Sequence, residues 1–467
     1  LHSTSRRQRQ MCIRDRDKYI ALDVNSGCVH VLDRLCYDIL RYLCETEQVP
    51  EEAVFQAVTR ELGGEWDRQE LDEAWADLKE LYESGVLFSA DDYADIAVNM
   101  KRNSPVKAMC LHVAHDCNLR CAYCFADEGA YHNRRELMSA ETGKRAMDFL
   151  IRHSGKRRNL EVDFFGGEPL MNFGVVKEVV AYAREQEKLH DKNFRFTITT
   201  NGVLLNDDNI AFINQNMSNV VLSLDGRKET NDRVRCRADG TGSYDSIVPK
   251  LIKVAESRNQ DNYYVRGTFT KYNLDFSRDV LHLADLGFQQ TSVEPVVSAP
   301  DVPYAITEED LPALFAEYEK LVDAYLARKK EGRGFHFFHF MIDLDQGPCV
   351  IKRLSGCGAG CEYLAVAPNG DIYPCHQFVG TEAYKMGNIK QDELNGEIRN
   401  RFESCNVYTK PKCRDCFAKF YCSGGCMANA CLLSGDINEP HEISCQLQRK
   451  RVECSLYAKA VEAELGL

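Results

Sequence analysis

The sequence predicts an α/β protein built on a partial TIM-like barrel, with a winged-helix-like module before it and a cysteine-rich domain after it. Strand patterns alternate with helical patterns from about residue 105 to 340, as in parallel βα units. Beyond residue 345 this periodicity weakens while cysteine and glycine become frequent, which is typical of a small domain held together by metal. We therefore expect a module at 17–95, a barrel at 105–340 and a third domain at 341–465.

The first module begins with a hairpin pattern. Two apolar segments, Tyr19–Val24 and Cys28–Leu32, flank a turn at 25–27, and Asp33 can cap the helix that follows. A later helical pattern, Leu71–Ser84, ends at a glycine, after which Val86–Phe88 can return as a strand. Residues 1–16 are rich in arginine and lack apolar periodicity, so we expect a misassembled or non-native leader outside the fold.

The barrel is predicted from seven strand patterns separated by helices. One of these helices, Ala140–His153, has Ser139 as its cap and Gly155 at its end. In such barrels the chemistry lies at the carboxyl ends of the strands. The predicted strands are Ala108–Val113, Leu160–Phe165, Arg195–Thr200, Asn219–Leu224, Tyr263–Thr270, Thr291–Val297 and Phe335–Met341.

Charge and hydropathy exclude several functional classes. The 467 residues include 58 Lys and Arg against 71 Asp and Glu, and the basic residues form no single stripe. Nucleic acid is therefore not an expected partner. Apolar runs stay well below the roughly 20 residues that cross a bilayer, so we expect a soluble, cytoplasmic protein without a membrane partner. In that reducing compartment, 21 cysteines need an explanation other than disulfides.

The cysteines of residues 111–125, LHVAHDCNLRCAYCF, carry the clearest chemical signal. A predicted strand runs directly into Cys117-x3-Cys121-x2-Cys124. Three thiolates on one loop can ligate three irons of a cubane and leave the fourth iron open for a ligand. A structural zinc loop is the alternative, but it would need a fourth ligand at tetrahedral spacing.

This motif, with Tyr123 before the last cysteine, resembles the signature of the radical S-adenosylmethionine (SAM) superfamily. The resemblance implies that SAM binds the open iron of a [4Fe–4S] cluster and is cleaved to methionine and a 5′-deoxyadenosyl radical. Supporting motifs end the next three predicted strands at 166–169, 199–202 and 223–226. Each alone is equally consistent with ordinary turn chemistry, but they recur in the family's order.

By resemblance, the Gly-Gly-Glu segment holds the SAM ammonium group, and Ser223 and Asp225 lie on its ribose side. Arg233 and Arg235 are left outside the predicted site, because exposed arginines more often only solvate a loop. No general base or other catalytic side chain can be assigned. The predicted cofactor-binding residues are Tyr123, Gly166, Gly167, Glu168, Asn201, Ser223 and Asp225.

The C-terminal cysteines resemble those of the SPASM domain, which carries two auxiliary [4Fe–4S] clusters and would bring the total to three. The resemblance assigns the second auxiliary cluster to Cys413, Cys416, Cys422 and Cys445. It assigns the first to Cys357, Cys375 and Cys426, with Cys361 as a possible fourth ligand. Without Cys361, the first auxiliary cluster has an open iron that could bind a substrate thiolate.

Residues 17–95 resemble the PqqD-like element that binds a leader peptide as an added strand. The alternative is a winged helix that caps the barrel or binds DNA, but acidic stretches near 45–52 and 91–95 disfavour DNA. The order of the three domains, with CLHVAHDCNLRCAYCFADEG and CGAGCEYLAVAPNGDIYPCHQFVG, resembles the maturases of SCIFF peptides, which are short, Cys-rich ribosomal precursors.

This resemblance implies that hydrogen is abstracted from an acceptor α-carbon, for example of Thr, and that a Cys sulfur then forms a sactipeptide-type thioether. The implied partners are a Cys-rich precursor with a leader and a reducing electron donor such as flavodoxin or ferredoxin. The alternatives are an anaerobic sulfatase maturase, which forms formylglycine, and a non-catalytic iron–sulfur electron carrier or peptide-binding scaffold.

Overall fold

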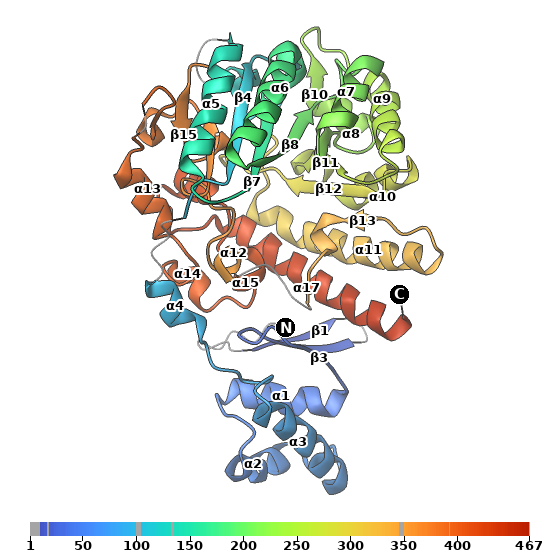
Figure 1. Ribbon diagram of the computed structural model, residues 1–467. Coiled ribbons are helices and arrows are strands. Elements are labelled where there is room, and N and C mark those ends of the chain that lie inside the picture. The colour runs from blue at the N-terminus through green and yellow to red at the C-terminus, as the bar shows by residue number, and fades with distance from the viewer. Residues whose placement is uncertain are drawn as a thin grey trace.

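The computed structural model describes residues 10–15, 18–99, 104–131, 135–344, 350–391 and 393–466. Three parts follow one another along the chain (Figure 1). The N-terminal module projects at one end, the parallel sheet and its helices form the other, and the C-terminal domain lies beside and between them.

The N-terminal module consists of a three-stranded antiparallel sheet and three helices. Asp33 caps the first helix by accepting a hydrogen bond from the Cys36 amide at 2.7 Å, as predicted. Phe55 and Trp75 stack at 4.9 Å in a separate apolar core beneath the sheet. The elements are β1 (Gln10–Asp15), β2 (Lys18–Asp23), β3 (Val29–Leu32), α1 (Arg34–Glu45), α2 (Glu52–Leu62) and α3 (Arg68–Glu83).

Two expectations for this module were wrong. Residues 10–15, which the sequence placed outside the fold, form β1 and pair with β2 from Gln10↔Asp23 to Asp15↔Lys18. Residues 1–9 and 16–17 lie outside the described part of the chain. Val86–Phe88 does not form a strand, because Phe88 takes a left-handed conformation with φ +53°, which interrupts extended backbone.

The central sheet has a strand at each of the seven predicted positions, and the strands are parallel. Its order is β13-β12-β11-β9-β8-β7-β4, so neighbouring strands are joined by helical crossovers. The strands are β4 (Ala108–His115), β7 (Asn159–Gly166), β8 (Asn193–Thr200), β9 (Asn219–Ser223), β11 (Tyr263–Phe269), β12 (Gln290–Pro295) and β13 (His336–Phe337). The crossover helices are α5 (Ala140–His153), α6 (Phe173–His190), α7 (Asp207–Asn216), α8 (Lys228–Val234), α9 (Tyr244–Ser257), α10 (Phe276–Asp285) and α11 (Leu311–Lys330).

The edges of the sheet differ from the prediction. The strand predicted at Phe335–Met341 shrinks to two residues, because a single helical turn at Phe338–Phe340 follows at once. At the other edge β14 (Tyr363–Val366) pairs in parallel with β4, and β15 (Asp371–Tyr373) and β16 (Gly387–Asn388) continue outward. The C-terminal domain therefore extends the barrel sheet, and the barrel is open.

The last helix connects all three parts. α17 (Glu442–Leu465) packs along α11 and reaches β2, where the Lys18 ammonium group lies 2.7 Å from a Glu464 carboxylate oxygen. No helix in the described ranges combines the length and apolar character needed to span a bilayer. The remaining helices are α4 (Tyr93–Asn99), α12 (Val350–Ser355), α13 (Gly396–Glu403), α14 (Pro411–Arg414), α15 (Lys419–Cys422) and α16 (Met427–Asn429).

Candidate active site

Three cysteines gather at the carboxyl end of β4. Cys117 follows the strand, and Cys121 ends the short β5 (Leu119–Cys121), which pairs with β10 (Arg235–Arg237). Burial, together with the charge of Cys124, raises the pKa of Cys117 to about 11 and that of Cys121 to about 12. These thiols therefore lie near one another in a site where a bound metal would have to deprotonate them.

The three thiols suit a [4Fe–4S] cluster, in which each thiolate binds a separate iron. Cys117, Cys121 and Cys124 also line a cavity of about 150 Å³ that can receive ligands of the fourth iron.

Two glycines close the next strand against the cysteine loop. A Cβ atom on Gly166, whose φ is +128°, would lie 2.2 Å from the Ala114 carbonyl oxygen, and one on Gly167 would lie 2.2 Å from that of Asp116. Gly167 N donates to the Ala114 carbonyl at 2.8 Å. Any side chain here would separate β7 from the loop, so both positions require glycine.

Glu168 joins the ends of two strands. Its carboxylate accepts hydrogen bonds from the Thr200 hydroxyl at 2.9 Å and from the Asn201 amide at 2.7 Å. Burial raises the pKa of Glu168, and these donors oppose the shift. The side chain is 0% exposed to solvent. The carboxylate thus forms a preorganised acceptor group at one wall of the cavity.

The 150 Å³ cavity, called the SAM cavity below, contains most of the predicted cofactor-binding residues. Six of the seven line it: Tyr123, Gly166, Gly167, Glu168, Asn201 and Ser223. Asp225 differs from the expectation, because it is fully buried and accepts hydrogen bonds from the Tyr123 hydroxyl and from the Thr268 amide at 3.0 Å. It positions Tyr123 and does not line the SAM cavity.

Arg235 is a site residue that sequence reasoning left out. Its side chain lines the SAM cavity and donates to the Tyr123 hydroxyl at 2.8 Å. The Nε atom is buried and has no hydrogen-bond partner among the described residues. Arg233 instead lies over the Tyr272 ring at 3.7 Å. Only the pairing of β5 with β10, which places Arg235 opposite Cys121, distinguishes the two arginines.

A second, larger cavity of about 510 Å³, called the chamber below, adjoins the SAM cavity. Both are lined by Tyr123, Ser223 and Arg235. The chamber extends from the carboxyl ends of the barrel strands to the C-terminal domain, where Cys422, Cys426 and Cys445 line its wall. A substrate in the chamber could therefore reach the SAM cavity and the predicted auxiliary ligands at the same time.

The C-terminal cysteines form two groups. Burial and the charges of Cys422, Cys445 and Cys416 raise the pKa of Cys413 to about 12, so these four thiols lie together. They are the four that the resemblance assigns to the second auxiliary cluster.

The other group surrounds Cys375. Burial raises the pKa of this thiol above its ordinary value, and the charges of Cys426 and Cys357 add to the shift. The structure thus brings together the three cysteines assigned to the first auxiliary cluster. Cys361 is buried in the apolar cluster that also contains Cys375, with an exposed fraction of 1%.

Comparison with known proteins agrees with this arrangement. Residues 111–269 match the model of the radical SAM superfamily, and residues 357–417 match the SPASM iron–sulfur cluster-binding domain. A cysteine-type anaerobic sulfatase-maturating enzyme of Clostridium novyi is 25% identical over 67% of this chain and 86% of its own. The mycofactocin maturase MftC of Mycolicibacterium smegmatis is 28% identical over 68% of this chain and 76% of its own.

Solved structures share the fold at low sequence identity. The enzyme anSMEcpe with bound AdoMet superimposes with a TM-score of 0.64 at 16% identity, covering 78% of this chain and all of its own. SuiB of Streptococcus suis, bound to its precursor peptide SuiA, gives 0.52 at 17% identity and covers 94% of this chain and 98% of its own. The three-cysteine loop, the SAM cavity and the matches to the two family models identify the chain as a radical SAM enzyme with a C-terminal SPASM domain, which uses SAM to generate a 5′-deoxyadenosyl radical.

Proposed function

We propose that this enzyme is a peptide maturase that joins Cys sulfur to an α-carbon in a short, Cys-rich ribosomal precursor, as the SCIFF peptide maturases do. The chamber is the observation that carries this proposal. It brings Ser223 and Arg235 of the SAM cavity into one space with Cys426, a predicted ligand of the first auxiliary cluster. A peptide held there can lose hydrogen at one wall and offer its thiol to an iron at the other.

Each crosslink removes two hydrogen atoms from the peptide. The α-carbon hydrogen leaves to the 5′-deoxyadenosyl radical, the thiol loses its proton, and the remaining electron leaves with formation of the C–S bond. An iron–sulfur cluster is the class of acceptor that this last electron needs. We infer three [4Fe–4S] clusters, held by the cysteine groups described above, and an external reductant such as flavodoxin or ferredoxin for the cluster in the barrel.

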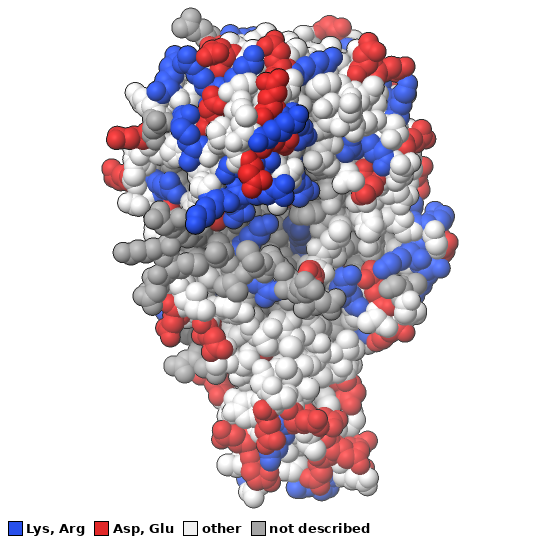
Figure 2. All heavy atoms as spheres, in the orientation of Figure 1, with Lys and Arg blue, Asp and Glu red and all other residues white. Residues whose placement is uncertain are grey.

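The N-terminal module is proposed to hold the leader. In the described part of the chain β3 pairs with β2 alone, so its other edge has no strand beside it and can accept an added one. Figure 2 displays acidic side chains concentrated over the helices of this module. That charge suits a leader rich in Lys or Arg and disfavours nucleic acid.

The SAM cavity also suggests individual roles. Arg235 offers an unpartnered Nε–H at the cavity wall, and we propose that it binds the SAM carboxylate. Gly166, Gly167 and Glu168 would hold the ammonium group, with Ser223 on the ribose side. Asn201 donates to the Asn118 side chain at 2.8 Å and would close the cavity beside the cluster.

Anaerobic sulfatase maturation is the second candidate, favoured by the likeness to the Clostridium novyi enzyme and to anSMEcpe. The extent of the structural matches favours peptide crosslinking. The anSMEcpe match leaves 22% of this chain uncovered, whereas the SuiB match leaves 6%, too little to omit the N-terminal module. The comparison supports a fold with a recognition module, as expected for an enzyme that follows a leader.

Mass spectrometry tests the proposal. The Cys-rich peptide encoded beside the gene is co-expressed anaerobically with the enzyme or with the Cys117→Ala/Cys121→Ala/Cys124→Ala variant. Only with the intact enzyme do we expect the peptide to lose two hydrogens per crosslink and its crosslinked Cys residues to resist alkylation. Conversion of Cys to formylglycine, which removes sulfur from the peptide, would support sulfatase-type maturation instead. An unchanged peptide despite SAM cleavage would reject this substrate.

A further inference from the structure

One of the three arginines that line the chamber lacks a partner. Arg235 is engaged with Tyr123, and Arg451 donates to the carbonyl oxygens of His339 and Phe338 at 3.2 and 3.4 Å. Arg266 of β11 lines the same space, and its side chain makes no hydrogen bond or ion pair within the described residues. Since a guanidinium group carries five donors and is always charged, this position is suited to an acceptor that enters from outside.

A carboxylate stands beside this arginine on the same face of the sheet. In the parallel register Arg266 pairs with Ser292 and Thr268 with Glu294, so Glu294 is the diagonal neighbour of Arg266. Glu294 also lines the chamber, and its side chain is 25% exposed there. The two side chains form no ion pair among the described residues, and both line the chamber, so a ligand in the chamber can contact both.

Glu294 is held in place from behind. The Ser292 hydroxyl donates to one carboxylate oxygen at 2.9 Å, and His339 Nε2 lies 3.0 Å from the other. His339 Nδ1 is in turn 3.0 Å from the Tyr318 hydroxyl. Burial opposes ionisation, but His339 and the guanidinium groups of Arg451 and Arg266 outweigh it and hold the pKa of Glu294 below its ordinary value. Glu294 is thus an ionised hydrogen-bond acceptor with a fixed position.

We propose that Arg266 and Glu294 form a subsite that holds one peptide group of the substrate, with the guanidinium group donating to its carbonyl oxygen and the carboxylate accepting from its N–H. A peptide group is neutral and has one acceptor and one donor, which matches this pair. A ligand carboxylate would be attracted by Arg266 but repelled by Glu294, and an ammonium group the reverse, so a neutral group with one donor and one acceptor satisfies both side chains.

The subsite also sets which part of the substrate reacts. Arg266 pairs in register with Ser223 of β9, which lines both the chamber and the SAM cavity. A peptide group held at Arg266 therefore places the adjoining α-carbon beside the SAM cavity. Because only backbone atoms are gripped, the same subsite can accept different acceptor residues. This inference rests on the proposed function only for the peptide nature of the substrate.

Binding measurements test the subsite without depending on crosslink formation. The probes are the Cys-rich peptide encoded beside the gene, at full length and as its leader alone, with anaerobic holoenzyme and SAM. We expect the full-length peptide to bind the wild type more tightly than the leader does. Arg266→Met and Glu294→Gln should each weaken full-length binding by about tenfold, the scale of one lost charged hydrogen bond, and leave leader binding unchanged.

Arg195→Met is the matched control. Arg195 shares its face of β8 with Thr199, which lines the chamber, but it lies near the amino end of the strand, outside the chamber. It should bind both peptides as the wild type does. Unchanged leader binding and cluster absorbance in Arg266→Met would exclude misfolding, and Arg266→Lys, which keeps a charge without the fork, should be intermediate.

Three results would overturn the subsite. The first is equal affinity of wild type and Arg266→Met for the full-length peptide, and the second is equal affinity of the wild type for full-length peptide and leader. The third is a loss of binding reproduced by amidating the acidic side chains of the peptide, which would assign Arg266 to a side-chain carboxylate. If Arg266→Met and Glu294→Gln weaken binding as expected but mass spectrometry detects no crosslink, thioether formation would be rejected and the subsite would be retained.

Discussion

The Tyr123 hydroxyl lies 2.9 and 2.7 Å from the two carboxylate oxygens of Asp225. This contact ties the cysteine loop to the end of β9, 102 residues further along the chain. Asp225 is fully buried, so its charge depends on Tyr123, on the Thr268 amide and on Arg235, 3.8 Å away. Tyr123 therefore stabilises the cysteine loop through its contact with Asp225.

Tyr123→Phe tests this contact. Removing the hydroxyl leaves a buried carboxylate short of a donor, and we expect a loss of about 1–3 kcal/mol in the free energy of unfolding, seen as a lower thermal midpoint. Tyr42→Phe is the control, because the Tyr42 hydroxyl makes no hydrogen bond among the described residues. Equal midpoints for the two variants would contradict the role given to Tyr123.

Arg235→Met should weaken SAM binding by about tenfold or more, because a charged donor to the SAM carboxylate would be lost. Isothermal titration of the anaerobic holoenzyme with SAM measures this directly. Arg233→Met removes a nearby arginine that lies over Tyr272, and should leave SAM affinity nearly unchanged. If Arg233→Met weakens SAM binding and Arg235→Met does not, Arg233 would be the residue that binds the SAM carboxylate.

Iron content distinguishes the candidate ligands of the first auxiliary cluster. The thiols of Cys357 and Cys426 lie close enough to Cys375 to affect its pKa, so Cys357→Ala should lower the iron content by about four atoms per chain. Cys361→Ala should keep the wild-type iron content, leaving the cluster with three protein ligands. Iron analysis and Mössbauer spectra of the reconstituted protein provide the measurement. Loss of iron in Cys361→Ala would show that Cys361 is the fourth protein ligand of this cluster.

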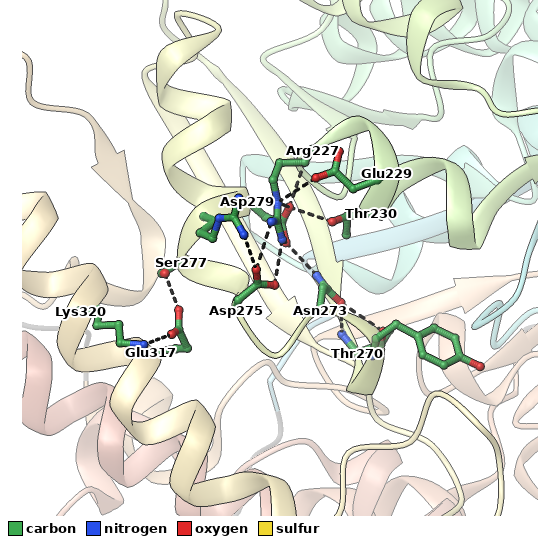
Figure 3. Close-up of polar contacts among 12 residues, drawn as sticks. Arg227, Glu229, Thr230, Thr270, Asn273, Asp275, Ser277, Asp279, Glu317 and Lys320 are labelled. Carbon is green, nitrogen blue, oxygen red and sulfur yellow. Dashed lines mark hydrogen bonds and ion pairs between the residues drawn. The ribbon is translucent and has the colours of Figure 1, made fainter.

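Gly226→Ala should destabilise the turn after β9. A Cβ atom there would lie 2.3 Å from that of Asp279, and φ at Gly226 is +122°. Asp279 cannot move aside, because Arg227, Thr230 and Asn273 all donate to its carboxylate (Figure 3).

We expect a loss of more than about 2 kcal/mol from Gly226→Ala, since backbone strain and overlap add. Gly240→Ala also places alanine at a positive φ, +81°, but has nothing within 4 Å of the new Cβ, so it measures the strain of a positive φ without overlap. Thermal unfolding compares the two variants. A similar midpoint for both would mean that the contact with Asp279 is easily relieved.

The sequence was sufficient where local signals were strong. The strands of the barrel are apolar, alternate regularly and end in polar motifs, and Ser139 caps its helix by accepting from the Thr142 amide at 3.1 Å. The three-cysteine loop is specific because few other sites use that spacing. Its neighbours along the SAM cavity could be assigned because they end successive parallel strands and so meet at one edge of the sheet.

Other features depend on contacts that no local pattern contains. β14 has four residues and β10 three, too few for a recognisable period, and both are set by pairing with distant strands. Arg235 lies in the site because strand pairing places it opposite Cys121, which its neighbours in sequence do not indicate. Asp225 shows the same limit, because a polar residue at a strand end can face a ligand or support another side chain, and here the fold places it against Tyr123.

α17 has a further consequence. Its first turn contains Cys445, a predicted cluster ligand, and its other end contacts β2 of the module that we propose holds the leader. At 24 residues it is a rod of about 36 Å. Such a rod fixes the distance between the anchored leader and the chamber, and so sets the effective concentration of each core residue at the radical. The position of a residue along the precursor, more than its identity, would then decide whether it is modified.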